Sequence, residues 1–366
     1  MKEMNVCPTS LSNNDRLSTI DVTKGIGFFL VVLGHLVSVN SKASIIIFSF
    51  HMPLFYIMSG YLMPTVVTRK SFFKRMTSLS FNYCFFTLFG LIITLIIPMW
   101  RAVFSKMSFL YDVVYNTQPE CIHVGQIWYL FSMLWVVLFF YGIHFVFANK
   151  TVFCALFSIL IAGVSIILSK LGIAVFIPKT GECWGIPLKI LSGMSGLLFV
   201  EIGYLFKKWD LVHKVDELGF VVKIIVSVIL LGVTIFFALR NEKVNIALGI
   251  YGNLAMYYIT SLGGTLSVVF FASLFRGKLA DVVGYYGKNS LPLFCFHSMW
   301  LYAYAAVLSM IKGYDISIMN NIEMPLCFLG MIVVIISIIP AKIIYDFTGK
   351  KLFNIIWDKL KVSLVG

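Results

Sequence analysis

The sequence predicts an all-α, polytopic integral membrane protein of about ten transmembrane helices. Hydrophobic residues make up 60% of its 366 residues and charged residues only 12%, whereas an average soluble domain carries roughly 25% charged residues. Windows of about 20 apolar residues, the length that crosses a bilayer core, recur along almost the whole chain. Helices are expected because a lipid-exposed backbone must satisfy its own hydrogen bonds.

The ten expected spans follow these apolar windows in order. They cover approximately residues 24–39, 44–66, 76–98, 126–147, 151–168, 185–206, 219–239, 254–274, 291–310 and 324–345. The eighth is the least regular, since glycines interrupt the apolar run 244–274 at positions 249, 252, 263 and 264. That run predicts either one broken helix or a short surface helix followed by a span.

Basic residues predict the orientation, because cytoplasmic loops accumulate Lys and Arg. With the N-terminus inside, most of the 29 basic residues fall in inner loops. We therefore expect a cytoplasmic segment over 1–23 that leads into a retained signal anchor, a membrane domain over 24–345 and a cytoplasmic basic tail over 346–366. The net charge of +13 reflects this bias and attraction to membrane lipid, and it indicates no nucleic-acid partner. Cys121 and Cys183 fall in predicted outer loops. The sequence is compatible with a disulfide bridge between them and with two free thiols.

The first span places three polar residues on one helix face. Lys24 and His35 are eleven residues apart, almost three whole turns, so they lie roughly 16 Å apart along the axis. Asp21 falls on nearly the same stripe. An ionisable side chain within a span is a functional-site hypothesis by default. The alternative is structural: Asp21 and Lys24 form an interfacial i,i+3 pair, and His35 caps the outer helix end.

The second span carries His51 two residues before Pro53. A proline cannot donate a hydrogen bond to the carbonyl four residues back, which belongs to Ser49, so a kink and a free carbonyl are expected there. If the turn between the two spans lies near residues 40–42, His51 reaches a depth similar to that of His35. Two imidazoles would then line one cavity. The alternative is that His51 satisfies the freed backbone group.

Other polar residues stand out from their apolar surroundings. The run from Arg69 to Arg75 holds four basic residues in seven, Arg69, Lys70, Lys74 and Arg75; it is either a positive-inside anchor or a phosphate clamp. Isolated polar residues within or beside later spans are Glu201, Asn253 and His297. No His, Cys and carboxylate cluster has ligand spacing, so no metal is expected.

Several of these motifs together resemble one family. They are RLSTIDVTKGI (16–26), VLGH ending at His35, FHMPLF (50–55), SGY (59–61), IWYL (127–130), EIGYLF (201–206), YGN (251–253) and GKNSLPL (287–293) followed by His297. In this order they are similar to the membrane acyltransferase-3 family, in particular its fucose 4-O-acetylase-like branch. The likeness covers most of the chain.

The resemblance implies a ten-helix O-acetyltransferase of the plasma (inner) membrane. Such an enzyme takes an acetyl group from cytoplasmic acetyl-CoA and delivers it to a hydroxyl of a cell-envelope glycan or lipid-linked sugar. The family's pattern of a basic residue, ten others and a histidine is matched by Lys24 and His35. The family's paired-arginine motif is half matched: Arg75 corresponds to the first arginine, and Ser78 occupies the position of the second. Lys24, Arg69, Lys74 and Arg75 are then expected to bind acetyl-CoA, and Asp21, Glu201, Asn253 and His297 to bind the acceptor.

The chemistry supports this assignment. Acyl transfer to an alcohol needs a base, and a neutral imidazole has a suitable pKa near 6.5. We expect His35 to be that base, and His51 or a backbone amide near Pro53 or Gly60 to donate to the developing oxyanion. A relay through an acyl-histidine at His35 is the second mechanism. A glycan or small-anion transporter is the competing class, and a non-catalytic partner in glycan synthesis is a third.

Overall fold

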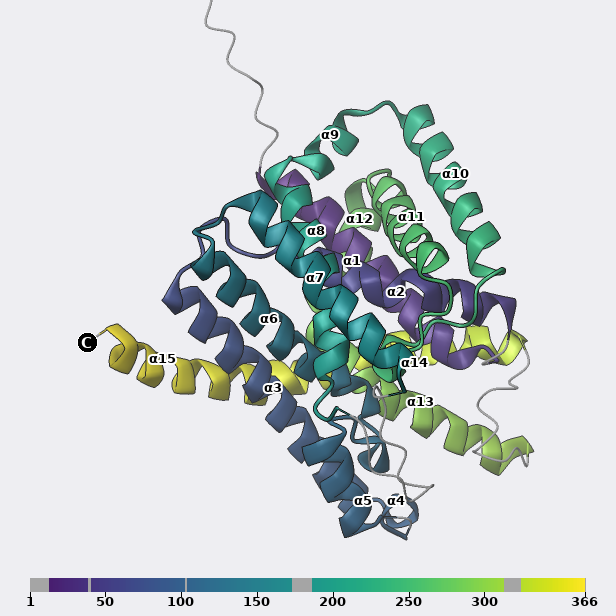
Figure 1. Cartoon of the computed structure of the whole chain (residues 1–366). Helices are drawn as coiled ribbons and strands as arrows, with labels where there is room; N and C mark the ends of the chain where they lie inside the picture. The colour runs from purple at the N-terminus through teal and green to yellow at the C-terminus, as the bar shows by residue number, and fades with distance from the viewer. Residues whose placement is uncertain (1–12, 39–40, 103, 173–185, 313–323, 366) are drawn as a thin grey trace, which may run out of the picture.

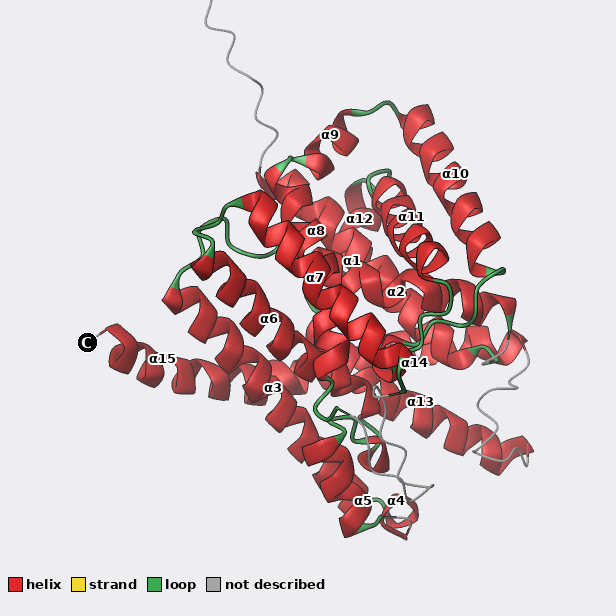
Figure 2. Cartoon of the chain, in the orientation of Figure 1, coloured by secondary structure: helices red, strands yellow, loops and turns green. Residues whose placement is uncertain are grey.

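The computed structural model describes residues 13–38, 41–102, 104–172, 186–312 and 324–365. Within these ranges the chain is helical and contains no strand (Figure 2). Ten of the described helical runs are long and apolar enough to cross a membrane, which confirms the predicted fold class. The long helices are α1 (Asn13–Leu36), α2 (Lys42–Tyr61), α3 (Arg69–Ile96), α6 (Trp128–Val146), α7 (Thr151–Lys170), α8 (Ile190–Lys208), α10 (Phe220–Ala238), α11 (Leu254–Ala272), α13 (Ser290–Lys312) and α14 (Met324–Tyr345).

Shorter helices connect or flank these spans. They are α4 (Pro98–Ala102), α5 (Lys106–Leu110), α9 (Leu211–Glu217), α12 (Gly277–Lys288) and α15 (Lys351–Val365). Helix α14 continues through a π-helical turn (Asp346–Lys350) into α15, so the segment expected as a tail is largely helical. In Figure 1, α14 lies beside α13, and α15 crosses α3 toward the left of the view.

The glycine-rich region around the eighth span forms a loop and then one unbroken helix. A 3₁₀ turn (Ile246–Leu248) precedes α11, and Gly263 and Gly264 lie inside that helix. Gly264 is needed for packing, since a Cβ there would lie 2.3 Å from the ring of Phe50 in α2. The glycines therefore serve a turn and a close helix contact and do not break the span.

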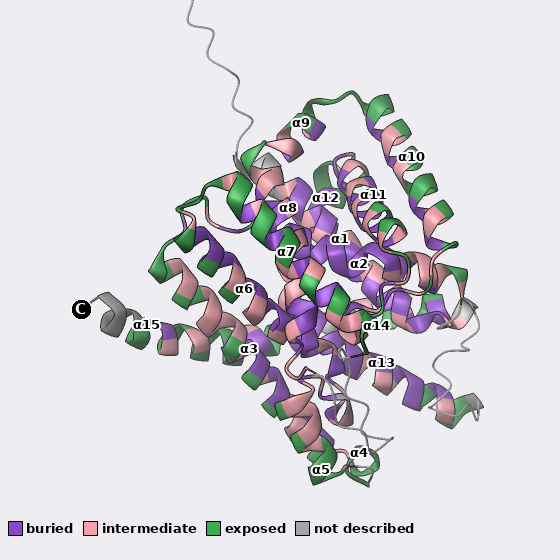
Figure 3. Ribbon diagram, in the orientation of Figure 1, coloured by how far each residue is buried: buried purple, intermediate pink, exposed green. Residues whose placement is uncertain are grey.

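Helices α1, α2 and α8 form the centre of the bundle, as their mostly buried ribbons show (Figure 3). Helix α2 packs against α1, α8 and α11, and α12 packs along α1. The backbones approach closely at glycines: a Cβ at Gly60 would lie 1.9 Å from the carbonyl oxygen of Val200, and one at Gly203 would lie 1.9 Å from that of Ile57. Small residues at such contacts are typical of helices that pack within membranes.

Helices α7 and α10 lie at the periphery and carry large exposed apolar side chains. Examples are Phe153 and Leu160 on α7, and Val228 and Ile229 on α10, each about half or more exposed. A soluble monomer rarely exposes contiguous apolar area of this size. These faces are suited to contact with lipid tails. Cys183 lies outside the described residues, so both alternatives for Cys121 and Cys183, a bridge and two free thiols, stay predictions.

Candidate active site

Three histidines from three helices meet inside the bundle. His35 lies near the end of α1, His51 in the middle of α2 and His297 in the first half of α13. The ring centroids of His35 and His297 are 5.5 Å apart, and all three imidazoles are close enough to interact electrostatically. The sequence predicted that His35 and His51 would share a depth, and His297 joins them from the opposite end of the chain.

The ring of Phe48 joins His35 to His51. Its centroid lies 5.9 Å from that of His35 and 4.8 Å from that of His51, edge-on to both. Phe48 is one turn before His51 on α2, which places both side chains on the same helix face. This aromatic contact fixes the two imidazoles relative to each other.

Hydrogen bonds determine which ring nitrogens carry protons. The Nδ1 of His51 donates to the carbonyl of Ile47 at 2.8 Å, and the Nδ1 of His297 donates to the carbonyl of Phe294. A carbonyl can only accept, so each ring is protonated at Nδ1 and, when neutral, presents a lone pair at Nε2. The Nε2 of His297 is buried without a partner among the described residues. The group is therefore arranged to accept a proton or a hydrogen bond.

Burial distinguishes the three rings. His51 is 4% exposed and His297 is fully buried, whereas His35 is only partly buried. His35 is thus the residue of the three with the largest exposed fraction. The carbonyl of Ser49, freed by Pro53, accepts a hydrogen bond of 3.2 Å from the hydroxyl of Ser261 in α11. His51 binds Ile47 instead, so its side chain does not serve the proline kink.

A cation from the loop between α10 and α11 completes this arrangement. The Nζ of Lys243 lies 4.1 Å from the centroid of the Phe48 ring, and it interacts electrostatically with His35 and His51. A cation over an aromatic face is stabilised by the ring quadrupole. Burial lowers the pKa of Lys243 below its ordinary value.

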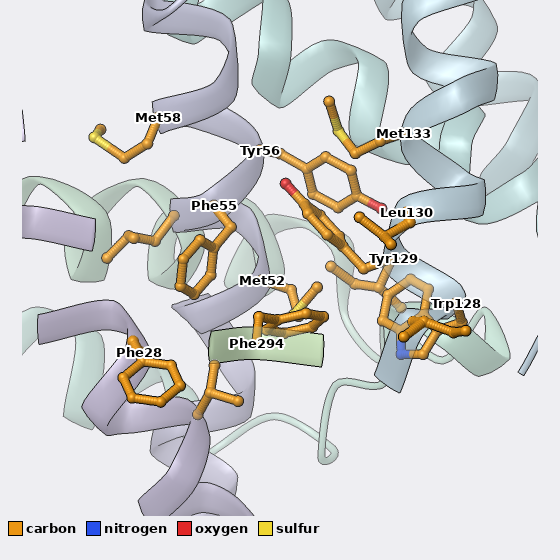
Figure 4. Close-up of a cluster of buried hydrophobic side chains, with 14 of the residues drawn as sticks. Phe28, Met52, Phe55, Tyr56, Met58, Trp128, Tyr129, Leu130, Met133 and Phe294 are labelled. Carbon is orange, nitrogen blue, oxygen red and sulfur yellow. The ribbon is translucent and has the colours of Figure 1, made fainter. Parts of the chain in front are cut away.

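A cluster of aromatic side chains packs against His297 through Phe294. The ring of Phe294 lies 5.4 Å from that of His297, 6.1 Å from that of Phe55 and 5.6 Å from that of Tyr129. Figure 4 shows the rings of Phe294, Phe55 and Tyr129 packed together with that of Tyr56. The cluster joins α2, α6 and α13, so it holds the helices that carry His51 and His297 in one arrangement.

The other residues of the first span lie away from this group, toward the start of α1. The Nζ of Lys24 is 3.6 Å from a carboxylate oxygen of Asp21, an i,i+3 pair. The same turn packs tightly on α12, because a Cβ at Gly287 would lie 1.7 Å from the carbonyl oxygen of Asp21. The structural alternative for Asp21 and Lys24 is thus present in the fold, and their roles in binding stay predictions.

The basic residues before the third span lie at the start of α3. Arg69 and Lys74 are exposed and Arg75 is partly buried. The guanidinium of Arg75 donates to the carbonyl of Leu62 at 2.6 Å, and the Nζ of Lys207 donates to that of Met63 at 2.7 Å. Cations from α3 and α8 therefore meet at the loop that joins α2 to α3. Their part in phosphate binding stays a prediction.

Glu201 lies in a different polar group from the three histidines. Its Oε2 is 3.1 Å from the Nε2 of His144, and both side chains are buried. The Nδ1 of His144 in turn lies 2.9 Å from the side-chain oxygen of Asn149. Asn253 caps α11, where its side chain accepts from the amide of Met256 at 3.1 Å. Neither contact tests the predicted role of Glu201 or Asn253 in acceptor binding.

The comparisons with known proteins agree with the motifs. A family profile described as an acyltransferase domain, Acyl_transf_3, matches residues 17–340, which is most of the chain and contains every histidine of the site. The chain belongs to the acyltransferase-3 family.

A nodulation protein, NolL, from Mesorhizobium japonicum (strain LMG 29417 / CECT 9101 / MAFF 303099) is 32% identical over 136 residues. The match spans 34% of this acyltransferase and 35% of NolL, about a third of each chain. No solved structure matches. Together with the ten apolar helices, the family match identifies the chain as a multi-pass membrane acyltransferase.

Sequence reasoning missed two residues beside the three histidines, Lys243 and Phe48, and one residue of the separate Glu201 group, His144. Lys243 ends the polar run 240–243, and nothing in its spacing connects it to His35. Phe48 is one of 34 phenylalanines, so its type carries no signal. His144 was the one residue with a usable signal, since it is a histidine within a span. Among the described residues, no group of three or more His, Cys, Asp or Glu is placed to hold a metal ion.

Proposed function

We propose that this acyltransferase moves an acetyl group from cytoplasmic acetyl-CoA to a hydroxyl of a cell-envelope glycan or lipid-linked sugar at the plasma membrane. The observation that carries the proposal is the meeting of His35, His51 and His297 from three helices, with Nε2 lone pairs on His51 and His297. A hydroxyl becomes a competent nucleophile only as its proton is removed, and imidazole is suited to that task.

The cations at the start of α3 favour a phosphate-bearing donor on the predicted cytoplasmic side. Acetyl-CoA carries its phosphates on the nucleotide and its thioester at the end of a long flexible arm. Arg69, Lys74 and Arg75 would bind the phosphates, because guanidinium and ammonium groups form strong charge-assisted hydrogen bonds with them. The thioester would then extend into the bundle toward the histidines.

His35 acts as the base in this proposal. Its imidazole accepts the proton of the acceptor hydroxyl while the hydroxyl oxygen bonds to the thioester carbonyl carbon. The carbonyl electrons move onto oxygen and return as the C–S bond breaks. The thiolate of CoA leaves and takes up the proton. In the relay variant, His35 first accepts the acetyl group itself and then passes it to the hydroxyl.

The direct test uses the purified full chain in detergent with acetyl-CoA radiolabelled in the acetyl group and a glycan-lipid extract. Label on the glycan supports the proposal, and label on the protein supports the relay. Absence of label from both overturns the proposal and favours a transporter or a non-catalytic partner. Glycan mass analysis of cells with and without the chain should show a difference of one acetyl unit.

A further inference from the structure

The loop that carries Lys243 is tied to the bundle on several sides. The side-chain amide of Asn241 donates to the carbonyl of Tyr251 at 3.1 Å, and its oxygen accepts from the amide of Asn253 at 2.7 Å. The backbones of Asn245 and Ile250 pair with each other in both directions. The loop is therefore a closed, ordered turn.

The start of α8 and the residue that precedes it also hold this loop. The Nζ of Lys189 donates to the carbonyl of Ala247 at 3.0 Å, and the hydroxyl of Ser192 donates to that of Ile246 at 2.9 Å. Val244 and Ile246 are buried at 1% and 3% exposure. Lys243 thus reaches Phe48 from a backbone whose position is fixed, which is what a preorganised electrostatic group requires.

The proposed transfer needs a hydrogen-bond donor that neutral His51 and His297 do not supply. As the tetrahedral intermediate forms, the carbonyl oxygen of the thioester gains a full negative charge. His51 and His297 use their Nδ1 protons on backbone carbonyls, so in the neutral state both offer lone pairs. A lone pair repels an oxyanion, and the donor must come from another group.

We propose that Lys243 is that donor and that its ammonium group binds the oxyanion formed during acyl transfer. The inference rests on the proposed function. An ammonium offers three N–H donors and a positive charge. The Nζ of Lys243 lies 4.1 Å from the centroid of the Phe48 ring, and that ring contacts the imidazoles of both His35 and His51. Lys243 donates a hydrogen bond to the oxyanion while the tetrahedral intermediate forms. The hydrogen bond weakens when the C–S bond breaks, because the oxygen becomes a neutral carbonyl again.

The test compares four variants in membrane vesicles supplied with acetyl-CoA radiolabelled in the acetyl group. The acceptor is added in increasing amounts, as vesicles prepared from cells that lack the chain. Lys243→Met removes the charge and keeps the stem, Lys243→Gln keeps a donor without charge, and Lys243→Arg keeps both. Arg240→Met is the matched control, because Arg240 sits in the same loop on the Phe236 ring, 3.5 Å from its centroid.

We expect Lys243→Met to lower the maximal rate about 10²- to 10³-fold, the usual effect of losing one oxyanion donor. The KM for acetyl-CoA and the half-saturating amount of acceptor vesicles should stay unchanged. Lys243→Gln should fall between Lys243→Met and Lys243→Arg, and Lys243→Arg should recover most of the rate. Arg240→Met should match the wild type, and all four proteins should show wild-type abundance and melting temperature.

Two results would overturn the inference while leaving the proposed function intact. One is a full maximal rate in Lys243→Met and Lys243→Gln. The other is a raised half-saturating amount of acceptor with an unchanged maximal rate, which would make Lys243 an acceptor-binding residue. If the wild type itself transfers no label, the proposed function fails. This result differs from a failure of the inference, because it is obtained with the wild type before any variant is compared.

Discussion

The carboxylate of Glu201 on α8 lies 3.1 Å from the Nε2 of His144 on α6, and both side chains are at most 1% exposed. Removing one partner of such a buried pair leaves the other without compensation, which costs roughly 3–5 kcal/mol. We therefore expect Glu201→Leu and His144→Leu each to lower the free energy of unfolding strongly. The double variant should lose much less than the sum. Denaturant unfolding in detergent micelles measures all three.

The matched control for this pair is His213→Leu. His213 pairs with Asp210 and Glu217 on the surface of α9, where an exposed pair contributes at most about 1 kcal/mol. Additive losses from Glu201→Leu and His144→Leu, within roughly 0.5 kcal/mol, would show that the two side chains do not interact.

His35→Ala should abolish acyl transfer while protein abundance and membrane insertion stay unchanged. His35 is the proposed base, and loss of a general base typically costs about 10²- to 10⁴-fold in rate. The measurement is the rate at which acetyl label from radiolabelled acetyl-CoA reaches the glycan. His213→Ala provides the histidine control outside the site and should retain full activity. A His35→Ala protein that still transfers label would remove His35 from the mechanism.

Arg75→Ala should raise the KM for acetyl-CoA roughly tenfold, the equivalent of one charge-assisted hydrogen bond of about 1.4 kcal/mol. The KM for acetyl-pantetheine, which lacks the nucleotide phosphates, should not change. This comparison separates phosphate binding from the contact that Arg75 makes with the carbonyl of Leu62, because a disturbed loop would affect both donors. Lys278→Ala on α12 is the control for loss of a surface cation.

The spans could be predicted from sequence because a bilayer constrains each one separately. The predicted segment 151–168 became α7 (Thr151–Lys170) and 219–239 became α10 (Phe220–Ala238), since hydropathy alone decides where a lipid-facing helix lies. Amphipathic α12 was not predicted. Gly284 and Gly287 of α12 pack on α1, and such a contact depends on a partner about 260 residues away in the chain.

The site was predictable only where a residue type was unusual for its place. A histidine inside an apolar run is rare, so His35, His51 and His297 could be found. Their meeting depends on how α1, α2 and α13 pack, which local pattern does not encode. Lys243 looks like an ordinary loop lysine in sequence, because only the fold of the 239–253 loop brings its ammonium over Phe48. Glu201 stood out as an isolated acid, but its partner lies on another helix.

The end of the bundle that carries His123 should become less stable as pH falls. Its ring lies between those of Trp100 and Tyr302, with centroids 4.2 and 4.5 Å away, and burial lowers the pKa of His123 from 6.5 to about 4. The unfolded chain takes up the proton near pH 6.5, so the folded state loses stability as pH falls from 6.5 toward 4. The melting temperature of the wild type should therefore fall relative to His123→Phe over this range, since the other histidines contribute equally to both proteins. A constant difference would contradict the assignment.

The close contact of α2 and α8 should tolerate no side chain at Gly203. A Cβ there would lie 1.9 Å from the carbonyl oxygen of Ile57, a backbone atom that cannot move without shifting α2. Because α2 carries Phe48 and His51, Gly203→Ala should lower both the melting temperature and the rate of acyl transfer. Gly232→Ala on α10 is the matched control: its Cβ would meet nothing within 4 Å, and replacing a helical glycine by alanine favours the helix by up to about 1 kcal/mol. Gly203→Ala with wild-type melting temperature and activity would mean that the two helices do not pack at this distance.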